Sequence, residues 1–252
     1  MVKLGGMTPE ERERYEKNKI EINKKVSSLI AEATKNAKLE YCILCSKPCS
    51  SFCNSHSIPQ FALKRIAEDG KVMLPLQDEI LTIGKDTGVN KAGTFHIICR
   101  DCDSRTFQLY EDPNAYNSKP TDQMLAQIAL KDVLLMISKR NQEREQYKLV
   151  GEQAEFLKDF ADEKIYLGDF DLRDYGEDLE YARSSLDGRK SNRYYLCFYT
   201  VLDYVVPYAA QSSITLISDF EDSIVNNICA YRLQAAGHKM QQRLLPGARR
   251  SD

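Results

Sequence analysis

Two cysteine pairs with the same internal spacing mark the part of the chain that could do chemistry. Cys42 and Cys45 form the first C-x2-C pair, and Cys99 and Cys102 form the second. Zinc is held tetrahedrally by thiolates, and two such pairs supply four of them. Because the N-terminal residues lack the apolar run of a secretion signal, the disulfides of an exported protein are a weaker interpretation. These four cysteines therefore predict a structural zinc site.

The remaining cysteines leave one alternative open. Cys49 and Cys53 give four thiols within "CILCSKPCSSFC", so a local site is conceivable, although it would leave the second pair without partners. Cys197 and Cys229 lie in apolar segments and are interpreted as small buried hydrophobic residues.

A histidine lies between the two pairs, His56 in "NSHSIPQ". With four thiols available, zinc does not need this imidazole as a ligand. Histidine exchanges its proton near neutral pH, so it can take a proton from an attacking water. The alternative is a surface or hydrogen-bonded structural histidine.

Two acids in "DSRTFQLYE", Asp103 and Glu111, could hold a divalent cation. If a helix begins near Arg100, these acids are eight residues apart, about two turns, and share one face with Phe107. Carboxylate oxygens suit Mg²⁺. His96, on a predicted strand before the second cysteine pair, could point to the same cleft. Each residue also has a simpler interpretation. Asp103 would be an acid at a helix N-terminus, Glu111 an acid at a helix end, and His96 an ordinary strand residue.

The order of these motifs resembles the HNH (ββα-metal) endonuclease family in its zinc-stapled, treble-clef form. That family commonly reads Asp-His-Ile-x-Pro after the first knuckle and Cys-x2-Cys-Asn at the second. The resemblance spans about residues 41–112. It implies that His56 is the general base and that Asp103, which stands where the family often has Asn, orients the base or its loop. Beside that resemblance we expect Asp103 and Glu111, together with His96, to place a catalytic Mg²⁺ or Mn²⁺, and zinc to be structural.

The sequence departs from that family at the metal site. Ser55 stands where the family usually has a metal-binding Asp or His, and no histidine follows Cys102 at the family's last ligand position. The metal site is therefore either rebuilt from Asp103, Glu111 and His96 or lost. A related variant, in which "SHxIP" is followed by a knuckle and then by Asp, Phe and Glu, favours rebuilding.

Composition restricts the partners only weakly. The chain has 252 residues, 42% of them hydrophobic, and a formal net charge of -2, so any binding to DNA or RNA needs a local basic patch. No apolar run is long enough for a membrane span, and we expect a soluble, cytoplasmic protein without membrane contact. The basic residues near the motifs are Lys64, Arg65, Lys71, Lys85, Lys91, Arg100 and Arg105.

Hydrophobic periodicity predicts several elements outside the motifs. "PTDQ" opens a core helix, and the acidic stretch 151–180 is interpreted as a solvated helix and loop. The predicted elements are a charged helix over 8–39, a short helix at 61–67, hairpin-like segments over 81–95, a helix from near Arg100, a core helix over 121–147, strands over 193–218 interrupted at Pro207, and a helix over 221–245 that would place His238 near its C-terminus.

These observations predict an α+β fold, a four-cysteine zinc treble-clef/HNH-like ββα module embedded among helices with a small antiparallel sheet. We expect an N-terminal helix over 1–40, the module over 41–112 and a helical and β-strand region over 113–252. The predicted function is metal-dependent hydrolysis of DNA or RNA phosphodiesters, compatible with a bacterial defence or mobile-element effector. The alternatives are a non-catalytic zinc module that binds nucleic acid or a protein partner, and a structural subunit of a larger assembly or homo-oligomer.

Overall fold

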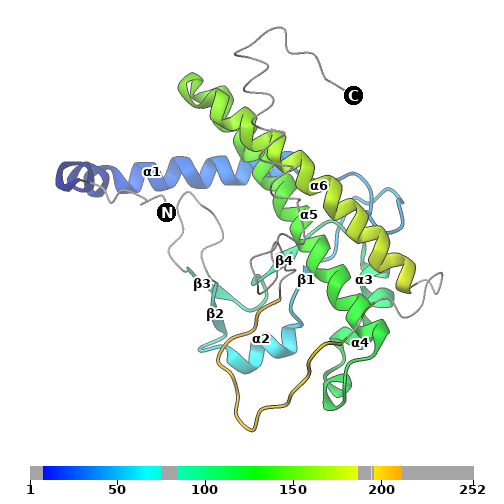
Figure 1. Ribbon diagram of the computed structural model, residues 1–252. Helices are drawn as coiled ribbons and strands as arrows, with labels where there is room; N and C mark the ends of the chain where they lie inside the picture. The colour runs from blue at the N-terminus through cyan, green and yellow to red at the C-terminus, as the bar shows by residue number, and fades with distance from the viewer. Residues whose placement is uncertain (1–7, 75–84, 187–193, 195, 212–252) are drawn as a thin grey trace, which may run out of the picture. The chain divides into compact units, whose positions relative to one another are not determined.

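The computed structural model describes residues 8–74, 85–186, 194 and 196–211, and this part of the chain is α+β and mostly helical (Figure 1). The chain divides into two compact units. Unit 1 comprises residues 1–38 and 141–165, and unit 2 comprises residues 39–140 and 166–252. No described helix is long and apolar enough to cross a membrane.

Unit 1 contains α1 (Pro9–Asn36), the end of α5 (Asp122–Gln153), the 3-10 turn η2 (Glu155–Leu157) and the start of α6 (Lys158–Leu186). The charged helix predicted over 8–39 is therefore confirmed. Exposed pairs such as Lys25 with Glu21, 2.9 Å apart and four residues apart in sequence, follow one face of α1. The acidic stretch 151–180, predicted as a solvated helix and loop, contains the end of α5, η2 and most of α6.

Unit 2 contains the remaining elements. They are β1 (Ser55–His56), α2 (Gln60–Ile66), β2 (Lys71–Leu74), β3 (Lys85–Gly88), β4 (Thr94–Phe95), α3 (Arg100–Thr106), α4 (Gln108–Glu111) and η1 (Pro113–Asn117), together with the larger parts of α5 and α6. Two antiparallel two-stranded sheets are present, β1 with β4 and β2 with β3.

Local sequence explains several of these boundaries. Thr121 caps α5 because its Oγ1 accepts a hydrogen bond from the Met124 amide at 3.2 Å. Before β2, Asp69 and Gly70 both have positive φ, the conformation that a tight Asp-Gly turn requires. Gly93 also has positive φ, and a Cβ there would lie 3.0 Å from Ser57 Oγ, so glycine permits the close approach of the β4 turn to the end of β1.

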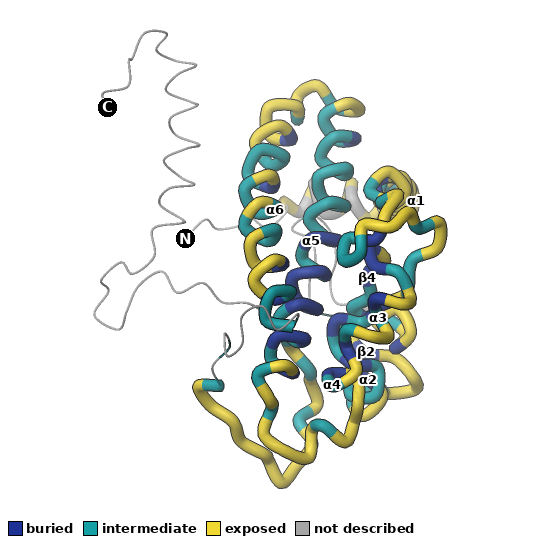
Figure 2. Tube along the Cα trace, turned by 90° about the vertical axis from the view of Figure 1, so that its right-hand side faces the viewer, coloured by how far each residue is buried: buried dark blue, intermediate teal, exposed yellow. Residues whose placement is uncertain are grey.

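The core of unit 2 joins the β1–β4 pair, α3 and the long helices. Its buried members include Phe95, Ile98, Phe107, Leu130 and Leu134. In Figure 2 the buried residues of α5 lie mainly in the half that belongs to unit 2. This core fixes the cysteine pairs and the β1–β4 strands against α5.

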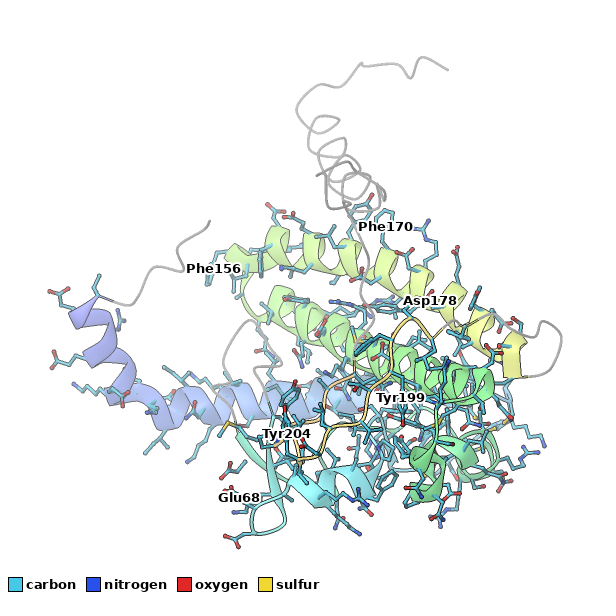
Figure 3. All side chains as sticks on the ribbon, turned by 60° about the horizontal axis from the view of Figure 1, so that its bottom comes forward. Glu68, Phe156, Phe170, Asp178, Tyr199 and Tyr204 are labelled. Carbon is cyan, nitrogen blue, oxygen red and sulfur yellow. The ribbon has the colours of Figure 1, made fainter. Side chains whose placement is uncertain are left out.

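Two predictions about the C-terminal half are corrected. Residues 194 and 196–211 contain no strand, and the segment that carries Tyr199 and Tyr204 (Figure 3) exposes Phe198 by 78% and Val201 by 74%. Strand propensity describes side chains that suit a paired, half-buried surface, and the described residues offer this segment no strand partner. Cys197 is exposed, not buried. The rest of the predicted strand region, 193, 195 and 212–218, and the predicted helix over 221–245, with Cys229 and His238, lie outside the described residues.

The helix predicted from Arg100 begins there but does not continue to Glu111. Phe107, with φ -111° and ψ 22°, separates α3 from α4. The side chain of Phe107 is fully buried, so the residue at which the helix breaks is also a core residue.

Candidate functional site

The four cysteines of the two C-x2-C pairs meet in unit 2. Their Sγ atoms all lie within 4.8 Å of one another. Cys99 forms the N-cap of α3, and its amide donates to Cys42 Sγ at 3.2 Å. Hydrogen bonding by the Lys47 amide lowers the pKa of the Cys45 thiol to about 7, which favours the thiolate. This cluster can hold a metal ion such as zinc.

The alternative local site is wrong. Cys49 Sγ lies 3.1 Å from the Ser51 carbonyl oxygen, and Cys53 Sγ donates to Asp103 Oδ2 at 3.2 Å. Burial, together with the neighbouring Asp103 carboxylate, raises the pKa of Cys53 to about 11. The Cys53 thiol is therefore a hydrogen-bond donor to the acid and not a metal ligand.

A buried lysine on α5, Lys131, connects the predicted acids, and sequence analysis did not identify it. Its Nζ donates to Ser55 Oγ at 2.6 Å, to Asp103 Oδ1 at 2.9 Å and to Glu111 Oε1 at 2.8 Å. An ammonium has three donors, so these three acceptors satisfy it completely. The Lys131 side chain is 0% exposed, and Nζ lies 4.1 Å from the centroid of the Phe107 ring.

Several neighbours of Asp103 stabilise its ionised form. Burial acts to raise the pKa of Asp103, but the Lys131 ammonium and the hydrogen bonds from Ser55, Lys131 and Cys53 outweigh it and hold that pKa below its usual range. Asp103 therefore remains ionised as the counter-ion of Lys131.

The predicted divalent cation does not fit between these acids. Asp103 and Glu111 are brought together as expected, despite the break at Phe107, but the atom that bridges their oxygens is Lys131 Nζ. Two unit charges 4 Å apart at an effective dielectric constant of 20 interact by about 4 kcal/mol, and a doubly charged ion beside Lys131 would meet about twice that repulsion. Ser55, which also contacts Nζ, completes a cluster arranged around an ammonium.

The imidazole of His56 is oriented by a backbone carbonyl. His56 Nε2 lies 3.0 Å from the Val89 oxygen, and because a carbonyl only accepts, Nε2 carries the proton. In the neutral ring, Nδ1 is then the proton acceptor. Asn90 forms hydrogen bonds on both sides of His56 in the sequence. Its backbone oxygen accepts from Asn54 at 2.8 Å, and its Oδ1 accepts from Gln60 at 2.7 Å.

His56, Asp103 and Glu111 share a pocket of about 520 Å³. A neighbouring pocket of about 550 Å³ shares Lys64 and Asn90 with it and adds Lys91. The remaining residues that line the first pocket are Asn54, Pro59, Gln60, Phe61 and Pro113. The two acids line the first pocket, Lys64 lines both pockets and Lys91 lines the second.

The other predicted site residue, His96, is placed elsewhere. It follows β4, is exposed, and does not occur among the described residues that line the His56 pocket. Of the predicted basic residues, Lys64 and Lys91 line these two pockets, whereas Arg105 bonds the Asp101 carbonyl on its own helix.

No family model matches the chain, and neither the curated proteins nor the solved structures contain a match.

Proposed function

We propose that this protein cleaves phosphodiester bonds in nucleic acid, with His56 as the general base. The observation that carries the proposal is the hydrogen bond from His56 Nε2 to the Val89 carbonyl. It fixes the tautomer and the ring orientation, so Nδ1 is the nitrogen that accepts a proton from the attacking hydroxyl group.

The surroundings of His56 support a phosphate-bearing substrate. Lys64 lines both the His56 pocket and the neighbouring pocket, and Lys91 lines the second. Positively charged residues along adjoining pockets suit the phosphate backbone of a nucleic-acid strand. Lys131 offsets part of the negative charge of Asp103 and Glu111, so a phosphate meets less repulsion beside them.

We infer that β1, β4 and α3 with the four cysteines form a zinc-stapled, treble-clef HNH-like module. The antiparallel pairing of Ser55 with Phe95 and the position of Cys99 at the start of α3 support this. Zinc is structural in this proposal, because four thiolates fill a tetrahedral shell and leave no position for substrate.

The test is cleavage of plasmid DNA and of RNA by the purified protein, with Mg²⁺, with Mn²⁺ and without added divalent ions. His56→Ala is expected to lose at least about 100-fold in rate, the lower end of general-base effects. His96→Ala is the comparison, since it changes an exposed histidine outside the pocket, and it is expected to retain activity. Zinc content and melting temperature must be equal in all three proteins.

The second candidate is a non-catalytic zinc module that binds nucleic acid or a protein partner. The observation that favours it is the pairing of both Asp103 and Glu111 with Lys131, which lies at the position expected for the cation. If wild type and His56→Ala are equally inert while both hold zinc, the cleavage proposal fails and this candidate replaces it.

A further inference from the structure

Lys131 supplies a positive charge at the place where a catalytic cation was expected. It does not reach the substrate, because its side chain is 0% exposed and its three donors are used by Ser55, Asp103 and Glu111. Lys131 is therefore a positioning residue that holds the two carboxylates in the pocket wall. His56 and Lys64 line this pocket, and its two carboxylates are paired with Lys131.

These groups restrict the reactions that the pocket can support. Hydrolysis of DNA needs an external water as nucleophile, and enzymes commonly lower the pKa of that water with a bound metal ion. RNA carries its own nucleophile, the 2′-hydroxyl, adjacent to the phosphorus that it attacks. Holding a nucleophile next to its target replaces much of the activation that an external water requires.

We propose that the substrate is RNA and that it is cleaved by transesterification without a divalent cation. This inference rests on the function proposed above. It adds the substrate class, the nucleophile and the independence from a catalytic metal.

The proposed step balances without any co-reactant. His56 Nδ1 takes the proton of the 2′-hydroxyl, and the 2′-oxygen forms a bond to phosphorus. The bond from phosphorus to the 5′-oxygen breaks, and that oxygen takes a proton from solvent water. Lys64 places positive charge beside the phosphoryl oxygens, and His56 later returns its proton to solvent. The products are a 2′,3′-cyclic phosphate and a 5′-hydroxyl, with no oxidation or reduction.

The experiment uses one sequence in three chemistries: an end-labelled RNA oligonucleotide, its 2′-O-methyl form and its DNA form. Each is incubated with the zinc-loaded full chain in buffer freed of other divalent ions, and again with added Mg²⁺ or Mn²⁺. Product ends are identified by mass spectrometry, in which a cyclic phosphate is lighter than a linear one by one water. His56→Ala is purified in parallel, because a contaminating ribonuclease would survive in that preparation.

The expected result is cleavage of the RNA alone, with cyclic phosphate ends, at a rate that added Mg²⁺ changes by less than about twofold. His56→Ala is expected to reduce the rate by at least about 100-fold. Cleavage of the DNA or 2′-O-methyl form, dependence on Mg²⁺ or Mn²⁺, or 5′-phosphate ends would overturn this inference while leaving the proposed nuclease function standing. No cleavage of any substrate, or equal cleavage by His56→Ala, would overturn both.

Discussion

The ammonium of Lys131 lies 2.9 Å from Asp103 Oδ1, so an acid expected to bind a metal ion is paired with a lysine from another helix. Ser55 completes the arrangement: it donates to the same Asp103 oxygen at 2.5 Å and accepts from Lys131. Ser55, at the position where a metal-binding residue was expected, therefore forms a hydrogen bond with Lys131. Together they explain how the cluster can exist without a divalent cation between its carboxylates.

Lys131→Met should destabilise the protein, because it keeps the length of the side chain and removes the charge. Loss of one partner from a buried ion pair leaves the other without compensation, and we expect the free energy of unfolding to fall by about 3 kcal/mol. Urea denaturation of the zinc-loaded proteins measures it.

The double variant Lys131→Met with Asp103→Asn separates this pairing from general loss of packing. We expect it to be more stable than the sum of the single variants predicts, by about 1–3 kcal/mol, since the second change removes the uncompensated charge. Additive effects would show that the two residues do not stabilise each other.

The same lysine should exclude divalent ions from the pocket. Wild type is expected to bind Mn²⁺ no better than Glu111→Gln does, whereas Lys131→Met, with two carboxylates left facing each other, should gain at least about tenfold in affinity. Electron paramagnetic resonance of free Mn²⁺ during titration measures the binding. Stoichiometric Mn²⁺ on wild type that disappears in Glu111→Gln would contradict the structure of this cluster.

The four-cysteine cluster and the long helices could be predicted because the spacing within each cysteine pair and the apolar periodicity are local signals. Cysteine spacing identified the four thiols that the structure brings together, and apolar periodicity identified α1 and α5. The partners of His56 and Asp103 could not be predicted, because Val89 and Lys131 are 33 and 28 residues away and only tertiary folding brings them near.

One signal for Lys131 was nevertheless present. It stands in "IALKDVLLMI", between Leu130 and Leu134 of the apolar stripe, with neither glycine nor proline nearby to end the helix. A lysine at a core position of a helix requires a buried acid, and Asp103 and Glu111 were already identified as candidates. The break at Phe107 carried no such signal, since "DSRTFQLYE" contains no helix breaker.

Zinc content should separate the clustered cysteines from their neighbours. Cys42→Ser is expected to lose the metal and to lower the melting temperature, because each thiolate is one of four ligands and the site couples metal binding to folding. Cys49→Ser is the matched control, since its thiol lies against the Ser51 carbonyl and outside the cluster, and it should retain about one zinc per chain. Loss of zinc in Cys49→Ser, or its retention in Cys42→Ser, would contradict the assigned ligand set.

An acid on α6, Asp178 (Figure 3), should make stability depend on pH in the opposite direction from a salt-bridged acid. Burial, then the negative charges of Asp174, Glu177 and Asp132, raise its pKa in the folded protein. The folded state thus holds this proton at pH values where the unfolded state has released it. Stability from this group is present below the unfolded pKa, about 3.9, and declines as pH rises toward the raised folded pKa.

Asp178→Asn should therefore stabilise the protein at pH 7, by about 0.5 kcal/mol after allowance for solvent screening, and should do so less at pH 4. Thermal melts across this range measure the difference, with Asp203→Asn in the exposed segment 196–211 as the control for loss of one negative charge. A larger stabilisation at pH 4 than at pH 7 would have the wrong sign for a raised pKa. Equal effects of the two variants would assign the gain to net charge instead of to the surroundings of Asp178.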